Sequence, residues 1–177
     1  MNAATMFGRF TRRASMTLPE PSRMAGKDLI VLVTVDPFLT SISFLERYSV
    51  GVPPGGQPRL MRTLTVQQSG VATIERDGER ALIVRGSHDM FGDTFSTVYY
   101  ERAFRAGEER VVGDMHVRVL EVDEAGLPMA VRFEFETPLE SKTYVVFEGH
   151  GFHEVTLPAL GERLEVQTTP FLDALGP

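Results

Sequence analysis

The stretch "MAVRFEFETP", residues 129–138, decides the fold class of this chain. Apolar residues alternate with charged ones along it: Val131, Phe133 and Phe135 against Arg132, Glu134 and Glu136. Successive side chains of a β-strand point to opposite faces, so this alternation places one row in a core and the other in water. The stretch therefore predicts a half-buried β-strand.

Short segments of the same kind recur from Arg59 onward. Turn residues separate them at intervals of about 8–12 residues, a spacing typical of antiparallel sandwiches and barrels. Asp77-Gly78 is a hairpin signal because glycine adopts a positive φ at no steric cost. In "MHVRVLEVD" (115–123) the apolar phase slips after Val119, which predicts a β-bulge. We therefore predict a mainly β protein, an antiparallel β-sandwich or partly open barrel of about eight to ten strands.

Upstream of these segments, "KDLIVLVTV" (27–35) is a continuous aliphatic and β-branched run. Such a run is typical of a strand that is buried on both faces. One short helix is predicted directly after it, at residues 37–49, because Asp36 can cap it and Pro37 fits its first position. Its apolar residues fall three or four positions apart: Phe38, Ile42, Leu45 and Tyr48.

The length of 177 residues predicts one domain with an extension. Residues 1–26 are predicted to form a flexible basic N-terminal arm, and residues 27–177 a single β-sandwich-like domain. The arm has a net charge of +3, from Arg9, Arg12, Arg13 and Arg23 against Glu20. Its arginine-rich start also fits an organelle transit peptide, or a juxtamembrane segment whose arginines favour anionic lipid head groups.

The core of the domain is predicted from the apolar rows of these strands. Each chosen residue belongs to a row that regular alternation, or continuous burial, turns inward. The set is Val31, Val33, Leu82, Val84, Val117, Val119, Val131, Phe133, Phe135, Val145 and Phe147.

Composition argues against several functional classes. The chain has no cysteine, which excludes disulfides, thiolate catalysis and sulfur-ligated zinc within it. Its net charge is −6, and the residues after the arm sum to −9, so a nucleic-acid partner is not expected. The longest apolar run, residues 29–35, is far short of the roughly 20 residues of a membrane-spanning helix, so no transmembrane segment is predicted in this chain.

One loop, "RGSHDMFGD" (85–93), has side chains that could perform chemistry. Ser87 and His88 are adjacent, and adjacent residues of an extended chain face opposite sides, which argues against a nucleophile–base pair. His88, Asp89 and Asp93 are candidate metal ligands if the loop curls around an ion. The favoured interpretation is a structural turn, because serine and aspartate side chains bind nearby backbone amides.

A pair of histidines lies in "EGHGFHE" (148–154). His150 and His153 are three positions apart, and such residues face opposite sides of a strand. A bend at the glycines would bring them together as metal ligands, but solvent-facing histidines at a strand junction are the favoured interpretation. No catalytic residue and no cofactor is predicted.

A series of segments in a fixed order resembles a known class of proteins. The apolar strand is followed by "DPF" (36–38), "PPGGQPRLMRTL" (53–64), "ALIVRG" (81–86), "FRAGEERVVGDMHVRVLEVDEAGLPMAVRFEFETPLES" (104–141) and "LGERLEV" (160–166). This series resembles the C-terminal soluble domain of uncharacterised multi-pass bacterial membrane proteins, over roughly residues 28–168. The resemblance implies a β-domain that works beside a membrane region, and it implies no catalytic residues.

These patterns predict a non-enzymatic accessory or protein-interaction β-domain, membrane-associated through its partners, with a cytoplasmic or membrane-peripheral location. Its partner is expected to be a protein or a membrane-protein assembly, bound by one sheet face or by the loops 51–58 and 86–95. The alternative is a small-ligand or metal-binding β-domain, with hydrolysis among its reactions, that uses the loop at 86–95. In that alternative the ligating residues are His88, Asp89 and Asp93, with His150 or His153.

Overall fold

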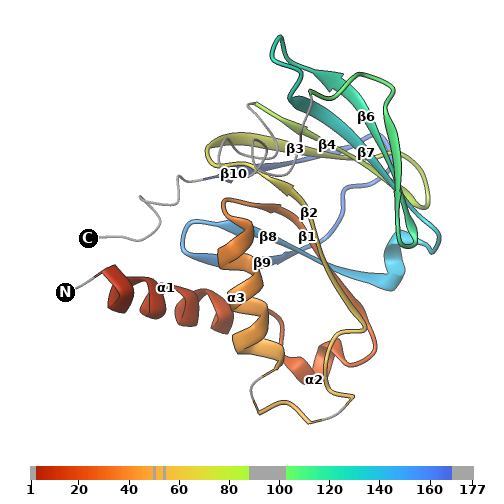
Figure 1. Cartoon of the computed structure of the whole chain (residues 1–177). Helices are drawn as coiled ribbons and strands as arrows, with labels where there is room; N and C mark the ends of the chain where they lie inside the picture. The colour runs from red at the N-terminus through yellow and green to blue at the C-terminus, as the bar shows by residue number, and fades with distance from the viewer. Residues whose placement is uncertain (1–2, 50, 54, 88–102, 169–177) are drawn as a thin grey trace.

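The computed structural model describes residues 3–49, 51–53, 55–87 and 103–168, with side chains from Gly8 onward. In these ranges the chain is mainly β, with two sheets, few helices and no closed barrel, which confirms the predicted fold class. Helices cover one face of a four-stranded sheet, and a six-stranded sheet covers its other face (Figure 1). The described residues thus form three layers.

The four-stranded sheet has the strand order β2–β1–β8–β9. Its members are β2 (Leu60–Val66), β1 (Asp28–Thr34), β8 (Lys142–Glu148) and β9 (Gly151–Val155). The central strand β1 pairs in parallel with both β2 and β8, a pairing that the sequence analysis did not predict. Every residue of β1 is buried, as predicted for a strand covered on both faces.

The six-stranded sheet has the order β10–β3–β4–β7–β6–β5 and is antiparallel throughout. Its members are β10 (Arg163–Thr168), β3 (Gly70–Arg76), β4 (Ala81–Gly86), β7 (Pro128–Phe135), β6 (Met115–Val122) and β5 (Glu109–Val112). The predicted hairpin is present between β3 and β4, where Asp77 N donates to Ala81 O at 2.9 Å and Gly78 has a φ of 113°. The predicted bulge is also present, because the β6–β7 register shifts after Val119.

Two apolar cores lie on either side of the four-stranded sheet. Between the sheets, Phe133 and Phe135 of β7 pack in one cluster with Ile30 of β1. On the helical side, Val31 and Phe147 pack in another. The predicted core residues are all buried except Val117, which is partly buried. The residues of β1 are thus divided between the two cores, which explains why its sequence is continuously apolar.

The predicted helix after β1 is present as α3 (Pro37–Tyr48). The Asp36 side chain caps it by accepting a hydrogen bond from Leu39 N at 2.6 Å. Its buried residues are Leu39, Thr40, Ser43, Phe44 and Tyr48. Phe38 and Leu45, which gave part of the helical period in the sequence, are 57% and 60% exposed. The helix therefore buries the face that contains Leu39 and Ser43, next to the face that contains Phe38 and Ile42.

Residues 3–24 differ from the expected flexible arm. They form α1 (Ala3–Thr17) and the single turn α2 (Pro21–Met24), and the side chains of Phe10, Ala14 and Leu18 are buried. The Thr17 hydroxyl accepts a hydrogen bond from Phe152 N at 2.6 Å, which joins α1 to β9. Phe10, Ala14 and Leu18 fall at helical spacing, but the basic, serine- and threonine-containing composition of this segment favoured the interpretation as a flexible arm.

Candidate functional site

The loop predicted at 86–95 is described only at its start, and His88, Asp89 and Asp93 lie outside the described residues. Ser87, just after β4, is described. Its Oγ accepts hydrogen bonds from Val71 N at 3.1 Å and from Gln67 Nε2 at 3.2 Å. This hydroxyl therefore binds the start of the loop to the start of β3 and to the segment before it. The interpretation of the loop as a metal site stays a prediction.

The two other candidate ligands are both exposed: His150 lies in the turn between β8 and β9, and His153 lies in β9. His153 Nε2 lies 3.2 Å from the carbonyl oxygen of Glu148. Together with Arg13 and Thr17 of α1, both histidines line a shallow surface hollow of about 470 Å³. Within the described ranges, no three or more His, Cys, Asp or Glu residues are grouped to hold a metal ion.

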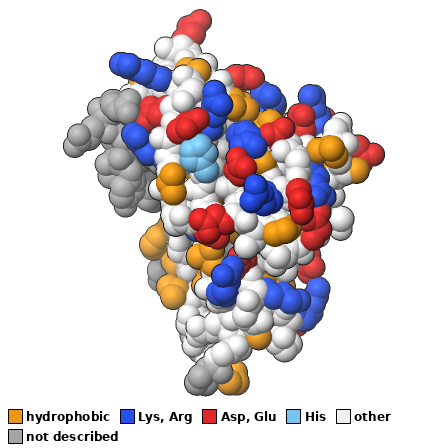
Figure 2. Space-filling view, turned by 90° about the vertical axis from the view of Figure 1, so that its right-hand side faces the viewer, with side chains coloured by type: hydrophobic (Ala, Val, Ile, Leu, Met, Phe, Trp, Pro, Cys, Tyr) orange, Lys and Arg blue, Asp and Glu red, His pale blue; other side chains and the backbone are white. Residues whose placement is uncertain are grey.

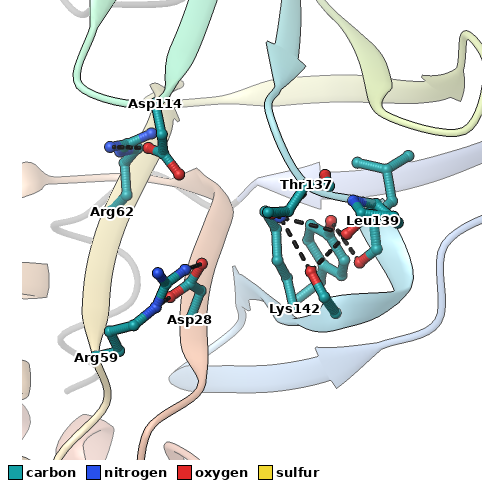
Figure 3. A network of polar contacts seen from close by, with 10 residues as sticks. Asp28, Arg59, Arg62, Asp114, Thr137, Leu139 and Lys142 are labelled. Carbon is teal, nitrogen blue, oxygen red and sulfur yellow. Dashed lines mark hydrogen bonds and ion pairs between the residues drawn. The ribbon is translucent and has the colours of Figure 1, made fainter.

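A cluster of charged residues lies where the three parallel strands begin (Figure 3). Asp28 is the first residue of β1 and its side chain is 2% exposed. Arg59, directly before β2, donates to both carboxylate oxygens of Asp28, at 2.8 and 2.6 Å. Two parallel N–H···O bonds of this kind fix the orientation of both partners, so this pair sets how β2 enters the sheet.

A second ion pair of the cluster joins the two sheets. Arg62 of β2 donates from Nη2 to Asp114 Oδ1 at 2.9 Å, and Asp114 lies in the turn between β5 and β6. Burial by itself raises the pKa of Asp114, but hydrogen bonds from Arg62 and from the backbone hold that pKa below its usual range. The carboxylate is therefore a fixed negative charge that anchors the six-stranded sheet to β2.

Lys142, the first residue of β8, completes the cluster and is 8% exposed. Its Nζ donates to the carbonyls of Thr137 and Pro138, at 3.3 Å each, and to the hydroxyls of Thr137 and Ser141. The Nζ also lies 5.0 Å from the centre of the Phe135 ring. Burial lowers the pKa of Lys142, and nearby Asp28 opposes that shift. The ammonium group thus holds the short 3-10 turn η1 (Leu139–Ser141) against β8.

The geometry of this cluster suits anchoring rather than catalysis. Each carboxylate is held by an arginine, and the ammonium of Lys142 is surrounded by oxygens that accept its hydrogen bonds. A general base or nucleophile needs a lone pair that substrate can reach, but the carboxylates here accept hydrogen bonds from arginines and the ammonium group of Lys142 has no free lone pair. The cluster is not apparent in the sequence, because its members are spread from Asp28 to Lys142. The available signal was a charged residue at the first position of two apolar runs.

In the described structure, exposed large apolar side chains occur as groups in two regions, while Met61, Val71 and Leu160 are exposed singly. On β5, Val111 is 73% and Val112 is 51% exposed. On the helical layer, Met16, Phe38 and Leu45 are 65%, 57% and 60% exposed. The side of the molecule seen in Figure 2 has charged side chains of both signs, with hydrophobic side chains scattered among them. These two apolar regions are therefore the candidate interaction surfaces.

Comparison with known proteins gives no relative. No protein-family model, no curated protein and no solved structure matches this chain. Among the helices in the described ranges, none is both long and apolar enough to cross a membrane.

Proposed function

We propose that this domain is a non-enzymatic protein-interaction module that binds an extended segment of a partner protein along the outer edge of β5. The observation that carries the proposal is the exposure of Val111 and Val112, 73% and 51%, on that strand. In the described part of the chain β5 pairs with β6 and with no other strand, so it ends the sheet. The partner is a protein, alone or within a membrane-protein assembly.

Strand addition follows from the geometry of an edge strand. Alternate residues of β5 direct their backbone N–H and C=O groups away from β6, where an incoming segment can bind them. Val111 and Val112 point to opposite faces of the sheet. An added strand would therefore meet one valine on each face, and cross-strand pairs of β-branched side chains stabilise such a pairing.

Charged side chains surround this apolar pair. His116 is the register partner of Val111, and its Nε2 lies 3.3 Å from Glu109 Oε2. Arg118 Nε lies 3.5 Å from the other oxygen of Glu109. An apolar centre with a polar rim is the usual anatomy of a protein-binding site. Backbone bonds would supply affinity here, and the rim would select the partner's side chains.

The proposal can be tested by selecting extended peptides from a random library against the intact chain. We expect selected peptides to slow hydrogen exchange of the β5 amides and Val111→Lys to weaken their binding at least about tenfold, since it places a charge in an apolar contact. The matched control is Val71→Lys. Val71 is 37% exposed, but its strand β3 is paired on both sides, by β10 and β4. Peptides that bind equally to both variants, or that leave the β5 amides unprotected, would contradict the proposal.

A further inference from the structure

The second apolar region lies on the outer face of the helical layer, away from β5. α1 and α3 pack on the same face of the four-stranded sheet, where Phe10 and Ala14 of one helix share a core with Leu39 and Phe44 of the other (Figure 1). The faces of the two helices that point away from the sheet are therefore exposed to solvent on the same side of the molecule. We call this outer face the helical surface and define it by the exposed residues of α1 and α3.

On α1 the helical surface is basic. Arg9, Arg12, Arg13 and Met16 are exposed, and they lie opposite the buried face that contains Phe10 and Ala14. The sequence of α1 contains no acidic residue. At 3.6 residues per turn these outward positions span one broad stripe, so the arginines point to the same side as Met16.

On α3 the helical surface is apolar. Phe38, Ile42 and Leu45 follow one another at helical spacing, and Ile42 is half-buried between its two exposed neighbours. This is a second apolar stripe on a helix whose first stripe is already buried against the sheet. Met16 brings the two helices together, because its sulfur lies 3.7 Å from Arg47 Nη1 on α3.

Two of the three acidic side chains described in the helical layer are engaged locally, and the third is half-buried. Glu20 is paired with Arg47 at 2.7 Å, and Asp36 caps α3. Glu46 is half-buried, and its Oε2 is buried without a hydrogen-bond partner among the described residues, so this carboxylate faces inward and is not part of the exposed surface. The helical surface is thus positive on a chain whose net charge is −6. Because of this contrast, a negatively charged partner is attracted to the helical surface and repelled by the rest of the molecule.

We propose that the helical surface binds the surface of an anionic lipid bilayer. Arginines would contact the head groups, while Phe38, Leu45 and Met16 enter the boundary between head groups and acyl chains. Each arginine near an anionic membrane contributes a factor of about five to partitioning. The few apolar side chains increase partitioning further but do not span the bilayer. Binding is therefore reversible, and it is sensitive to salt because the arginines contribute most of it. β5 would stay accessible to a protein partner.

Co-sedimentation of the full chain with vesicles tests this proposal. We expect binding to vesicles of phosphatidylcholine with about 30% phosphatidylserine, and little binding to phosphatidylcholine alone. Replacing Arg12 and Arg13 together by glutamine should lower partitioning about 25-fold. Replacing Arg118 and Arg163 by glutamine removes the same charge from the six-stranded sheet, where these side chains are 53% and 63% exposed, and should change little.

A fluorescent label distinguishes a bilayer from an acidic protein partner. Because the chain has no cysteine, Leu45→Cys and Val111→Cys each provide one labelling site. An environment-sensitive dye should shift to the blue at position 45, and not at position 111, when anionic vesicles are added. Equal binding to both kinds of vesicle, a shift at position 111 alone, or binding to polyglutamate without binding to vesicles would overturn the proposal.

Discussion

Asp28 and Lys142 are register partners at the first positions of the parallel strands β1 and β8, and both are buried. Burying charge is costly unless each group is paired or hydrogen-bonded, and here Arg59 holds the carboxylate while backbone and hydroxyl oxygens hold the ammonium. A slip of one residue in either strand would move a charge into the apolar core. The charged cluster therefore fixes the register of the central sheet.

The Asp28–Arg59 pair should respond unequally to the loss of each partner. Arg59→Met leaves a carboxylate that is 2% exposed without its bidentate donor, whereas Asp28→Asn leaves an arginine whose side chain is 61% exposed to water. We expect Arg59→Met to lower the free energy of unfolding more than Asp28→Asn does. Urea denaturation of both variants and of the double variant measures the difference. Equal losses would mean that water reaches the carboxylate.

The second prediction concerns Phe133, which is 3% exposed between the sheets. Phe133→Ala should lower the free energy of unfolding by about 3–5 kcal/mol, because truncation loses apolar burial and leaves a cavity. Val111→Ala, at a position 73% exposed, is the control and should change it by less than about 0.5 kcal/mol. A loss below about 1 kcal/mol for Phe133→Ala would show that the inter-sheet core collapses around the gap.

The third prediction is a pH dependence at Asp114. Its pKa is lower in the folded protein than in an unfolded chain, so the unfolded state binds more protons as the pH falls. The stabilisation is complete above the unfolded value of about 3.9 and is lost as the pH falls through the folded value. Asp114→Asn should therefore lower the free energy of unfolding by about 1–2 kcal/mol near neutral pH, and by progressively less as the pH falls through the folded pKa. If wild type and Asp114→Asn still differ in stability by the same amount in acid, the effect comes from packing and not from the charge of Asp114.

The fourth prediction tests whether α1 belongs to the fold. A Cβ at Gly151 would lie 2.6 Å from Thr17 Oγ1, closer than packed atoms allow. Gly151→Ala should push α1 away from β9 and accelerate tryptic cleavage at Arg12 or Arg13, with a loss of about 1–3 kcal/mol in stability. Adding Thr17→Ala should restore part of the protection by removing the nearest atoms. Unchanged cleavage of Gly151→Ala would show that α1 does not depend on this contact.

The fifth prediction concerns the loop at 86–95. If it is a structural turn, His88→Ala should hardly change the melting temperature, and neither zinc, calcium nor a chelator should alter it. An ion held only by the folded state would stabilise it by about 2.7 kcal/mol at a hundredfold excess over its dissociation constant. Melting curves of wild type and variant with each additive make the comparison. A metal-dependent rise that His88→Ala abolishes would favour the metal-binding alternative.

The helices show where periodicity was and was not enough. Asp36 and Pro37 located the start of α3 correctly, because capping chemistry is local. The sequence did not reveal which stripe of α3 is buried, since both of its stripes contain apolar residues. On α1, the small residues Ala14 and Ser15 are buried on the same face as Phe10. Only contact with β9 and α3 makes that face an interior one.

The sequence by itself determined the class of the fold, the hairpin at Asp77-Gly78 and the bulge after Val119, because alternation, turn chemistry and a phase slip act over a few residues. The tertiary structure decided the parallel pairing of β1, the charged cluster around Asp28 and the two exposed apolar surfaces. Each of these depends on which distant segments come together. Pairing across long sequence separation is set by the burial of whole faces and by the matching of isolated charges. A single sequence does not contain that information in any local pattern.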